Sequence, residues 1–171
     1  TNSIILLLDE DANKQNILSA LQRMFEAADE DDICLIYFSG HGKNESYDEN
    51  LFVPKDYLRL NSNELSISSI SHQEFFQALQ VARASKSCQI VLIHDSHSGY
   101  YKWVGDNDIY LGAVRHTMQT ERSFNGGHTA SAFLLALVDI IRQTKGKITY
   151  RHLLQWLRFK IEYKYDVENE W

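Results

Sequence analysis

The sequence predicts an α/β fold built on a mostly parallel sheet, and two observations support this. Four short apolar runs have the length of strands, and segments with helical periodicity separate them. Most of these runs are continuously apolar rather than alternating, which is typical of strands covered on both faces. With 171 residues and 44% hydrophobic side chains, the chain can bury one core. We therefore expect a single domain over residues 1–171.

The predicted elements follow in chain order. The strands are the apolar runs Ser3–Leu8, Ile33–Phe38, Gln89–Ile93 and Ile109–Arg115. The first helix carries apolar side chains at helical spacing between Ile17 and Phe25, with Asp11 as its predicted N-cap. Further helices are expected at about Gln73–Ala84, Thr129–Gln143 and Thr149–Tyr163. Loops rich in Asn, Ser and Asp are expected at Gly42–Asn50 and Leu58–Ser71, within one long connection of the kind that often carries function.

The composition excludes several classes of partner. Lys and Arg number 17 against 23 Asp and Glu, so the formal charge of -6 disfavours nucleic acid and anionic membrane surfaces. Every apolar run is well short of the roughly 18 residues that cross a bilayer. The two cysteines, Cys34 and Cys88, lie in apolar, strand-like surroundings, where reduced buried thiols are expected. These features together favour a cytoplasmic protein.

Two of the predicted strands end abruptly in small and reactive residues. The first ends in YFSGHG at 37–42 and the second in LIHDSHSG at 92–99. Active sites of open parallel sheets gather at the carboxyl ends of strands, so His41 and Ser96 are expected in one crevice. Ser96 follows His41 by 55 residues. That spacing is close to the one that separates the histidine from the cysteine nucleophile in caspases.

YFSGHG resembles the histidine motif of metacaspases, and HDSHSG resembles their nucleophile motif, with Ser96 in the cysteine position. The flanking segments resemble the same caspase-like peptidases of the C14 type along nearly the whole chain. The resemblance implies a three-layer fold with helices on both faces of the sheet. It also implies that the family's first strand and helix precede Ser3–Leu8. Residues 1–171 would then be the catalytic domain of a longer protein.

The same resemblance implies the chemistry of a cysteine endopeptidase that cuts protein or peptide substrates. His41 would be the acid and base, and the side chain at 96 the nucleophile. The backbone N–H groups of Gly42 and Ser96 would form the oxyanion hole. A regulatory domain or partner protein would control such a site.

Serine at position 96 departs from this pattern. A hydroxyl is far less acidic than a thiol, and serine enzymes generally need a base oriented by a third group. We consider an engineered Cys→Ser change first, a natural pseudopeptidase second and a true serine enzyme last. The alternative function is a non-catalytic binding or scaffold module. An unrelated α/β hydrolase is disfavoured because the residues around Ser96 lack the G-x-S-x-G glycines.

Substrate preference and metal binding also depart from the metacaspase pattern. Metacaspases place an aspartate two residues before the nucleophile, where this chain has His94. Asp95 follows, and on a strand it should point to the other side, so the resemblance leaves the P1 residue of the substrate open. The candidate pocket residues are Ser39, His94 and Asp95. Asp56 matches one acidic position of the family, but one carboxylate does not make a calcium site. We therefore expect no metal ligand set and no cofactor.

Overall fold

The α/β prediction is confirmed by the computed structural model, in which helices accompany a parallel three-stranded sheet. The structure describes residues 4–44, 50–53, 69–83, 88–96, 108–113, 121–123 and 129–162. The chain divides into two compact units, residues 1–116 and residues 117–171, and each is described by itself. None of the helices within these described ranges is long and apolar enough to cross a membrane.

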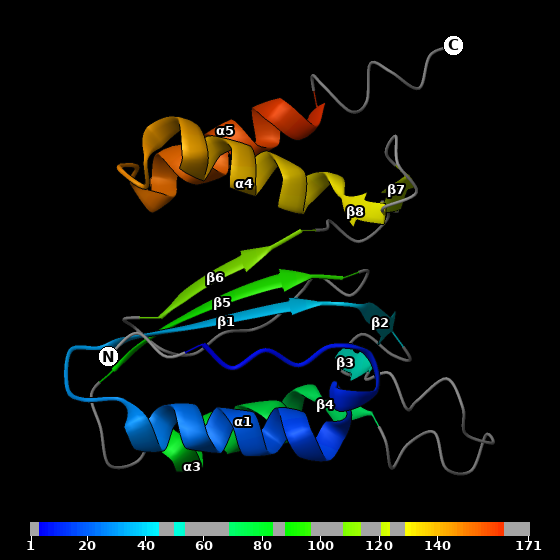
Figure 1. Cartoon of the computed structure of the whole chain (residues 1–171), viewed down its shortest axis with the longest axis vertical. Coiled ribbons are helices and arrows are strands. Elements are labelled where there is room, and N and C mark those ends of the chain that lie inside the picture. The colour runs from blue at the N-terminus through cyan, green and yellow to red at the C-terminus, as the bar shows by residue number, and fades with distance from the viewer. Residues whose placement is uncertain are drawn as a thin grey trace. The chain divides into compact units, whose positions relative to one another are not determined.

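A parallel sheet forms the centre of the first unit (Figure 1). Its strand order is β1-β5-β6, with β1 at Ile33–Ser39, β5 at Gln89–Asp95 and β6 at Ile109–Gly112. All three were predicted from their apolar runs. However, β5 continues two residues further than expected, because His94 and Asp95 still pair with Phe38 and Ser39 of β1. The end of the sheet is therefore polar.

Two helices pack on one face of this sheet, α1 at Lys14–Ala27 and α3 at His72–Arg83. The predicted N-cap Asp11 is wrong, because Asp11 ends a 3-10 turn, η1, at Asp9–Asp11. The backbone of Asn13 is extended, and its side chain accepts the N–H of Asn16 at 3.0 Å, so Asn13 caps α1. At the start of α3, Ser71 and Glu74 exchange two hydrogen bonds in a capping box.

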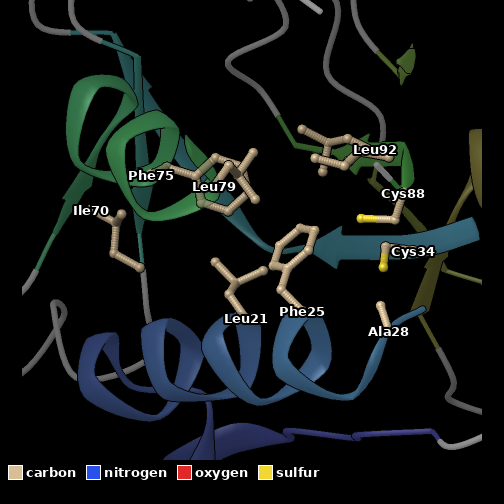
Figure 2. Close-up of a cluster of buried hydrophobic side chains, with 10 residues drawn as sticks. Leu21, Phe25, Ala28, Cys34, Ile70, Phe75, Leu79, Cys88 and Leu92 are labelled. Atoms are coloured by element: carbon tan, nitrogen blue, oxygen red, sulfur yellow. The ribbon is translucent and has the colours of Figure 1, made fainter. Parts of the chain in front are cut away.

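Apolar side chains from both helices and the sheet form one buried cluster, shown in Figure 2. The helices contribute Leu21, Phe25, Phe75 and Leu79, which contact Cys34, Ile90 and Leu92 of the strands. Cys34 and Cys88 are buried free thiols, as expected. Cys34 is only 4% exposed and packs within this cluster, so it serves packing rather than catalysis.

The predicted strand at Ser3–Leu8 is wrong. Residues 4–8 form no strand, and Ile4 is 90% exposed while Leu6 and Leu8 are also exposed. An apolar run becomes a strand only where a neighbour completes its hydrogen-bond ladder. Within the ranges that the structure describes, no strand pairs with this segment.

The long connection after β1 contains strands that the sequence did not reveal. It holds β2 at His41–Asn44, β3 at Asn50–Val53 and β4 at Ile70–Ser71, which form an antiparallel sheet in the order β2-β3-β4. The prediction of loops over Gly42–Asn50 and Leu58–Ser71 is therefore wrong where β2, β3 and β4 occupy their ends. These strands have two to four residues each, too few to produce a visible alternation.

The second unit contains a hairpin and two helices. Strands β7 at Glu121–Ser123 and β8 at Thr129–Ser131 pair antiparallel, and α4 follows at Ala132–Thr144. The helix predicted from Thr129 thus begins three residues later, capped by Ser131, whose Oγ accepts the N–H of Leu134. Helix α5 covers Tyr150–Lys160 and is capped by Thr149. Lys160 pairs with Asp139 of α4, which joins the two helices.

Candidate active site

The carboxyl ends of β1 and β5 meet at one edge of the parallel sheet. Ser39 pairs with Asp95, and the N–H of Gly40 donates to the carbonyl of Asp95 at 3.2 Å. His41 and Ser96 are the residues that follow on each side. The two motifs therefore leave the sheet at the same edge, and the prediction that His41 and Ser96 share one site stays a prediction.

Glycine at position 40 leaves room for the ring of Phe38, two residues earlier. A Cβ added there would lie 3.1 Å from Cζ of Phe38, tighter than ordinary contact. Immediately after Gly40 the chain enters β2, where His41 pairs with Val53 and Gly42 with Phe52. The side chain of His41 lies outside the described part of the structure. The predicted role of Gly42 in the oxyanion hole rests on its backbone N–H and stays a prediction.

Ser96 directly follows the last residue of β5 and is only 2% exposed. Its Oγ lies 3.1 Å from Nε2 of His94, within hydrogen-bond distance. The candidate nucleophile therefore contacts an imidazole two residues earlier on its own strand.

His94 is completely buried among aromatic side chains. Its ring stacks on Phe38, with centroids 5.4 Å apart and planes inclined by 16°. Tyr110 of β6 lies on the other neighbouring strand, its ring centroid 6.4 Å away. Burial lowers the pKa of His94 to about 4, so the ring is neutral at neutral pH.

Asp95 is also buried, 4% exposed, and its carboxylate belongs to the opposite face of β5 from His94. The hydroxyl of Tyr37 donates to Oδ2 of Asp95 at 3.2 Å. Burial raises the pKa of Tyr37 to about 12; a hydrogen bond with Ser39 opposes this rise, and the negative charge of Asp95 adds to it. Ser39 itself is exposed at the end of β1. The three predicted pocket residues thus separate, with Ser39 and Asp95 near Tyr37 and with His94 among the rings.

Sequence reasoning missed Tyr37, Phe38 and Tyr110 as neighbours of the site. Tyr37 and Phe38 open the YFSGHG motif, and alternation along β1 assigns them to opposite faces. That alternation could have linked Tyr37 to Ser39. The contact with Tyr110 depends on β6 lying beside β5, which the sequence does not specify.

Within the described ranges, no three His, Cys, Asp or Glu side chains are grouped so that they could hold a metal ion. Asp56, the one acidic residue that matches a calcium-site position, lies outside those ranges. Whether the chain binds calcium therefore has to be measured.

Comparison with known families gives the wider context for this edge of the sheet. The sequence model of one family, the caspase domain of the peptidase C14 type, matches residues 6–170, which is almost the entire chain. The chain belongs to the caspase domain family. Its α/β architecture with a parallel sheet agrees with a caspase-like fold, and the family consists in general of cysteine peptidases, which are hydrolases. A search of curated proteins gives no match to this caspase domain.

Proposed function

We propose that this caspase domain is a cysteine-type endopeptidase domain with its site at the ends of β1 and β5. His41 acts as acid and base, and the side chain at position 96 acts as the nucleophile. The observation that carries the proposal is the register of β1 with β5, in which Ser39 lies opposite Asp95. This register supports a site at that edge, because His41 lies two residues beyond Ser39 and Ser96 one residue beyond Asp95.

The proposed reaction divides peptide hydrolysis into two steps. With cysteine at position 96, the thiolate attacks the scissile carbonyl carbon and forms a thioester, while the imidazolium of His41 protonates the departing amine. His41 then takes a proton from water, which attacks the thioester and releases the acid product. The N–H groups of Gly42 and residue 96 stabilise the oxyanion in both steps. This chemistry requires no cofactor.

With serine instead of cysteine at position 96, we expect this chain to have almost no peptidase activity. A thiol with a pKa near 8.5 ionises readily beside an imidazolium, whereas a hydroxyl does not. The imidazole that contacts Ser96 is that of His94, and it is buried with the hydroxyl. Whether the serine is engineered or natural is decided by the codon at position 96 of the source gene.

One observation favours a second function, that of a pseudopeptidase acting as a binding or scaffold module. The Ser96 hydroxyl is almost inaccessible and already hydrogen-bonded, which suits a structural side chain as well as a silenced nucleophile. Under either function we propose a cytoplasmic protein that binds protein substrates or partners and responds to a regulatory domain or partner protein.

The test is the Ser96→Cys variant, assayed on a peptide library with mixed P1 residues, with and without calcium. Cleavage should rise clearly above that of the parent chain. His41→Ala added to Ser96→Cys should lower the rate about 100-fold or more, because general acid–base catalysis contributes at least that factor. The preferred P1 residue and any calcium requirement are obtained from the same assay.

A folded Ser96→Cys variant that neither cleaves peptides nor reacts with a thiol-directed covalent probe would contradict the peptidase proposal and favour the scaffold. The assay should be repeated with candidate partner proteins added. Circular dichroism of both variants shows whether they are folded.

A further inference from the structure

The contact between His94 and position 96 assigns a role to a residue that the proposed dyad does not use. We propose that His94 is a positioning residue that holds the side chain at position 96 in a withdrawn rotamer, turned into the buried side of the sheet. The proposal builds on the proposed function, since it concerns the same candidate nucleophile. It predicts that release from His94 makes position 96 more accessible.

The first argument is geometric. Nε2 of His94 lies 3.1 Å from Oγ of Ser96, and both side chains are almost fully buried. A serine at the end of a strand next to a sheet edge has rotamers that point outward to solvent as well as inward. Here Ser96 is 2% exposed and its Oγ lies beside a ring nitrogen, which corresponds to the inward orientation.

His94 itself is held by contacts with the strands on both sides of β5. Its ring stacks on Phe38 of β1, and its backbone carbonyl accepts the N–H of Ala113 at 2.9 Å, just beyond β6. Strands on both sides therefore hold it. Because His94 is fixed in this way, a hydrogen bond to it can select one rotamer of the side chain at position 96.

The third argument is chemical. The buried imidazole is neutral, so in one tautomer Nε2 accepts the serine hydroxyl proton and in the other it donates to Oγ. Either tautomer holds the side chain. A thiol at position 96 can make the same contact more weakly, and it must leave this rotamer to reach a substrate carbonyl at the sheet edge.

Two substitutions of His94 separate the hydrogen bond from packing. His94→Phe keeps an aromatic ring against Phe38 and removes the hydrogen bond. His94→Gln loses the ring and keeps an amide that can occupy a place close to that of Nε2. Both are made in the full chain that carries Ser96→Cys, and iodoacetamide alkylation of the thiol introduced at position 96 is followed by peptide mass spectrometry. The Ser96 parent measures the background from the buried Cys34 and Cys88.

The quantity compared is the alkylation rate on its plateau above the thiol pKa, because this rate reports access rather than ionisation. His94→Phe should raise it about twofold to fivefold, the lower part of the range for losing one hydrogen bond because sulfur bonds weakly, and His94→Gln should stay near the His94 rate. Equal plateau rates for the Phe and Gln variants would overturn the proposal. The assay needs no peptidase activity, so it tests the hydrogen bond from His94 separately from the proposed function, which the cleavage assay tests.

A second measurement avoids substitution of the buried histidine. The imidazole 15N resonances of His94 are recorded in the parent chain and in Ser96→Ala, a small change that removes the hydroxyl. The Nε2 resonance should move more than the Nδ1 resonance. If neither resonance moves, the hydrogen bond does not exist in solution and the proposal fails.

Discussion

Strands β1 and β5 are neighbours of equal length, yet their environments differ. Each has seven residues, and their sequences, ICLIYFS and QIVLIHD, are similarly apolar. Six successive residues of β5 are buried, whereas exposed residues alternate with more buried ones along β1. Every second residue of β1, beginning with Ile33, is exposed, so the exposed residues share one face, while Cys34, Ile36 and Phe38 share the face that packs against α1 and α3. Strand β5 is buried on both faces. Apolar composition indicates a strand, and packing on each face decides how much of it is buried.

The contrast extends to the polar ends of the two strands. Ser39 and Gly40 at the end of β1 are exposed, while His94, Asp95 and Ser96 at the end of β5 are buried. Buried polar groups are costly unless they are hydrogen-bonded, and the bonds to Ser96 and from Tyr37 meet part of that requirement. The candidate nucleophile position therefore lies at the buried end of the central strand, β5. The candidate histidine follows β1, the more exposed strand.

The largest expected effect is on stability, and one substitution on each strand tests the difference in burial between β5 and β1. Leu92→Ala, at a side chain with 0% exposure on β5, should lower the free energy of unfolding by about 2–5 kcal/mol through the cavity it leaves. Leu35→Ala, at 57% exposure on β1, should cost about 0.5 kcal/mol or less. Urea denaturation measures both. Equal losses would show that β1 and β5 are equally buried in solution.

A smaller effect concerns the polar end of β5. Between its ordinary pKa of 6.5 and the value of about 4 in the folded protein, His94 takes up a proton only when the chain unfolds. The free energy of unfolding should therefore fall by about 3 kcal/mol as the pH drops from 6.5 to 4, with no contribution from His94 above that window. Urea denaturation of the parent and of His94→Phe across this pH range measures the contribution of His94 to the unfolding free energy. Parallel pH curves for the two would contradict it.

The smallest effect concerns the hydrogen bond that joins the two polar ends. Tyr37→Phe removes the donor to Oδ2 of Asp95 and should cost about 1 kcal/mol of unfolding free energy. It should also remove an ionisation at about pH 12 from the ultraviolet titration, since the phenol of Tyr37 has a pKa of about 12. Tyr150→Phe, at the same 42% exposure on α5, is the matched control and should change stability little. Similar losses in both variants would show that the contact with Asp95 adds nothing.

Sequence patterns predicted β1, β5 and β6 because each is a continuous apolar run, and they predicted the helices because apolar residues recur at helical spacing. They failed where structure depends on a partner. The run Ser3–Leu8 has the composition of a strand but no ladder within the described residues, and β2, β3 and β4 are too short to be recognised.

The candidate site was predictable to the same extent. Parallel strand ends meet at one edge, so the pairing of Ser39 with Asp95, just before the two candidate residues, followed from the pattern. The burial of His94 did not follow, because it depends on Phe38 from one neighbouring strand and Tyr110 from the other. Spacing along the chain carries no information about such cross-strand neighbours.

The pairing of β1 with β5 also has a consequence for how quickly this protein folds. Ile33 must find Gln89 across the whole intervening stretch, which includes α3 and the β2-β3-β4 sheet. Contacts between residues so distant in sequence slow folding, because the entropy of closing the long loop is lost before the contact stabilises anything. On the ribosome, β1 emerges well before its partner. A nascent chain therefore has no assembled sheet edge, and no candidate site, until the second half of the first unit has been synthesised.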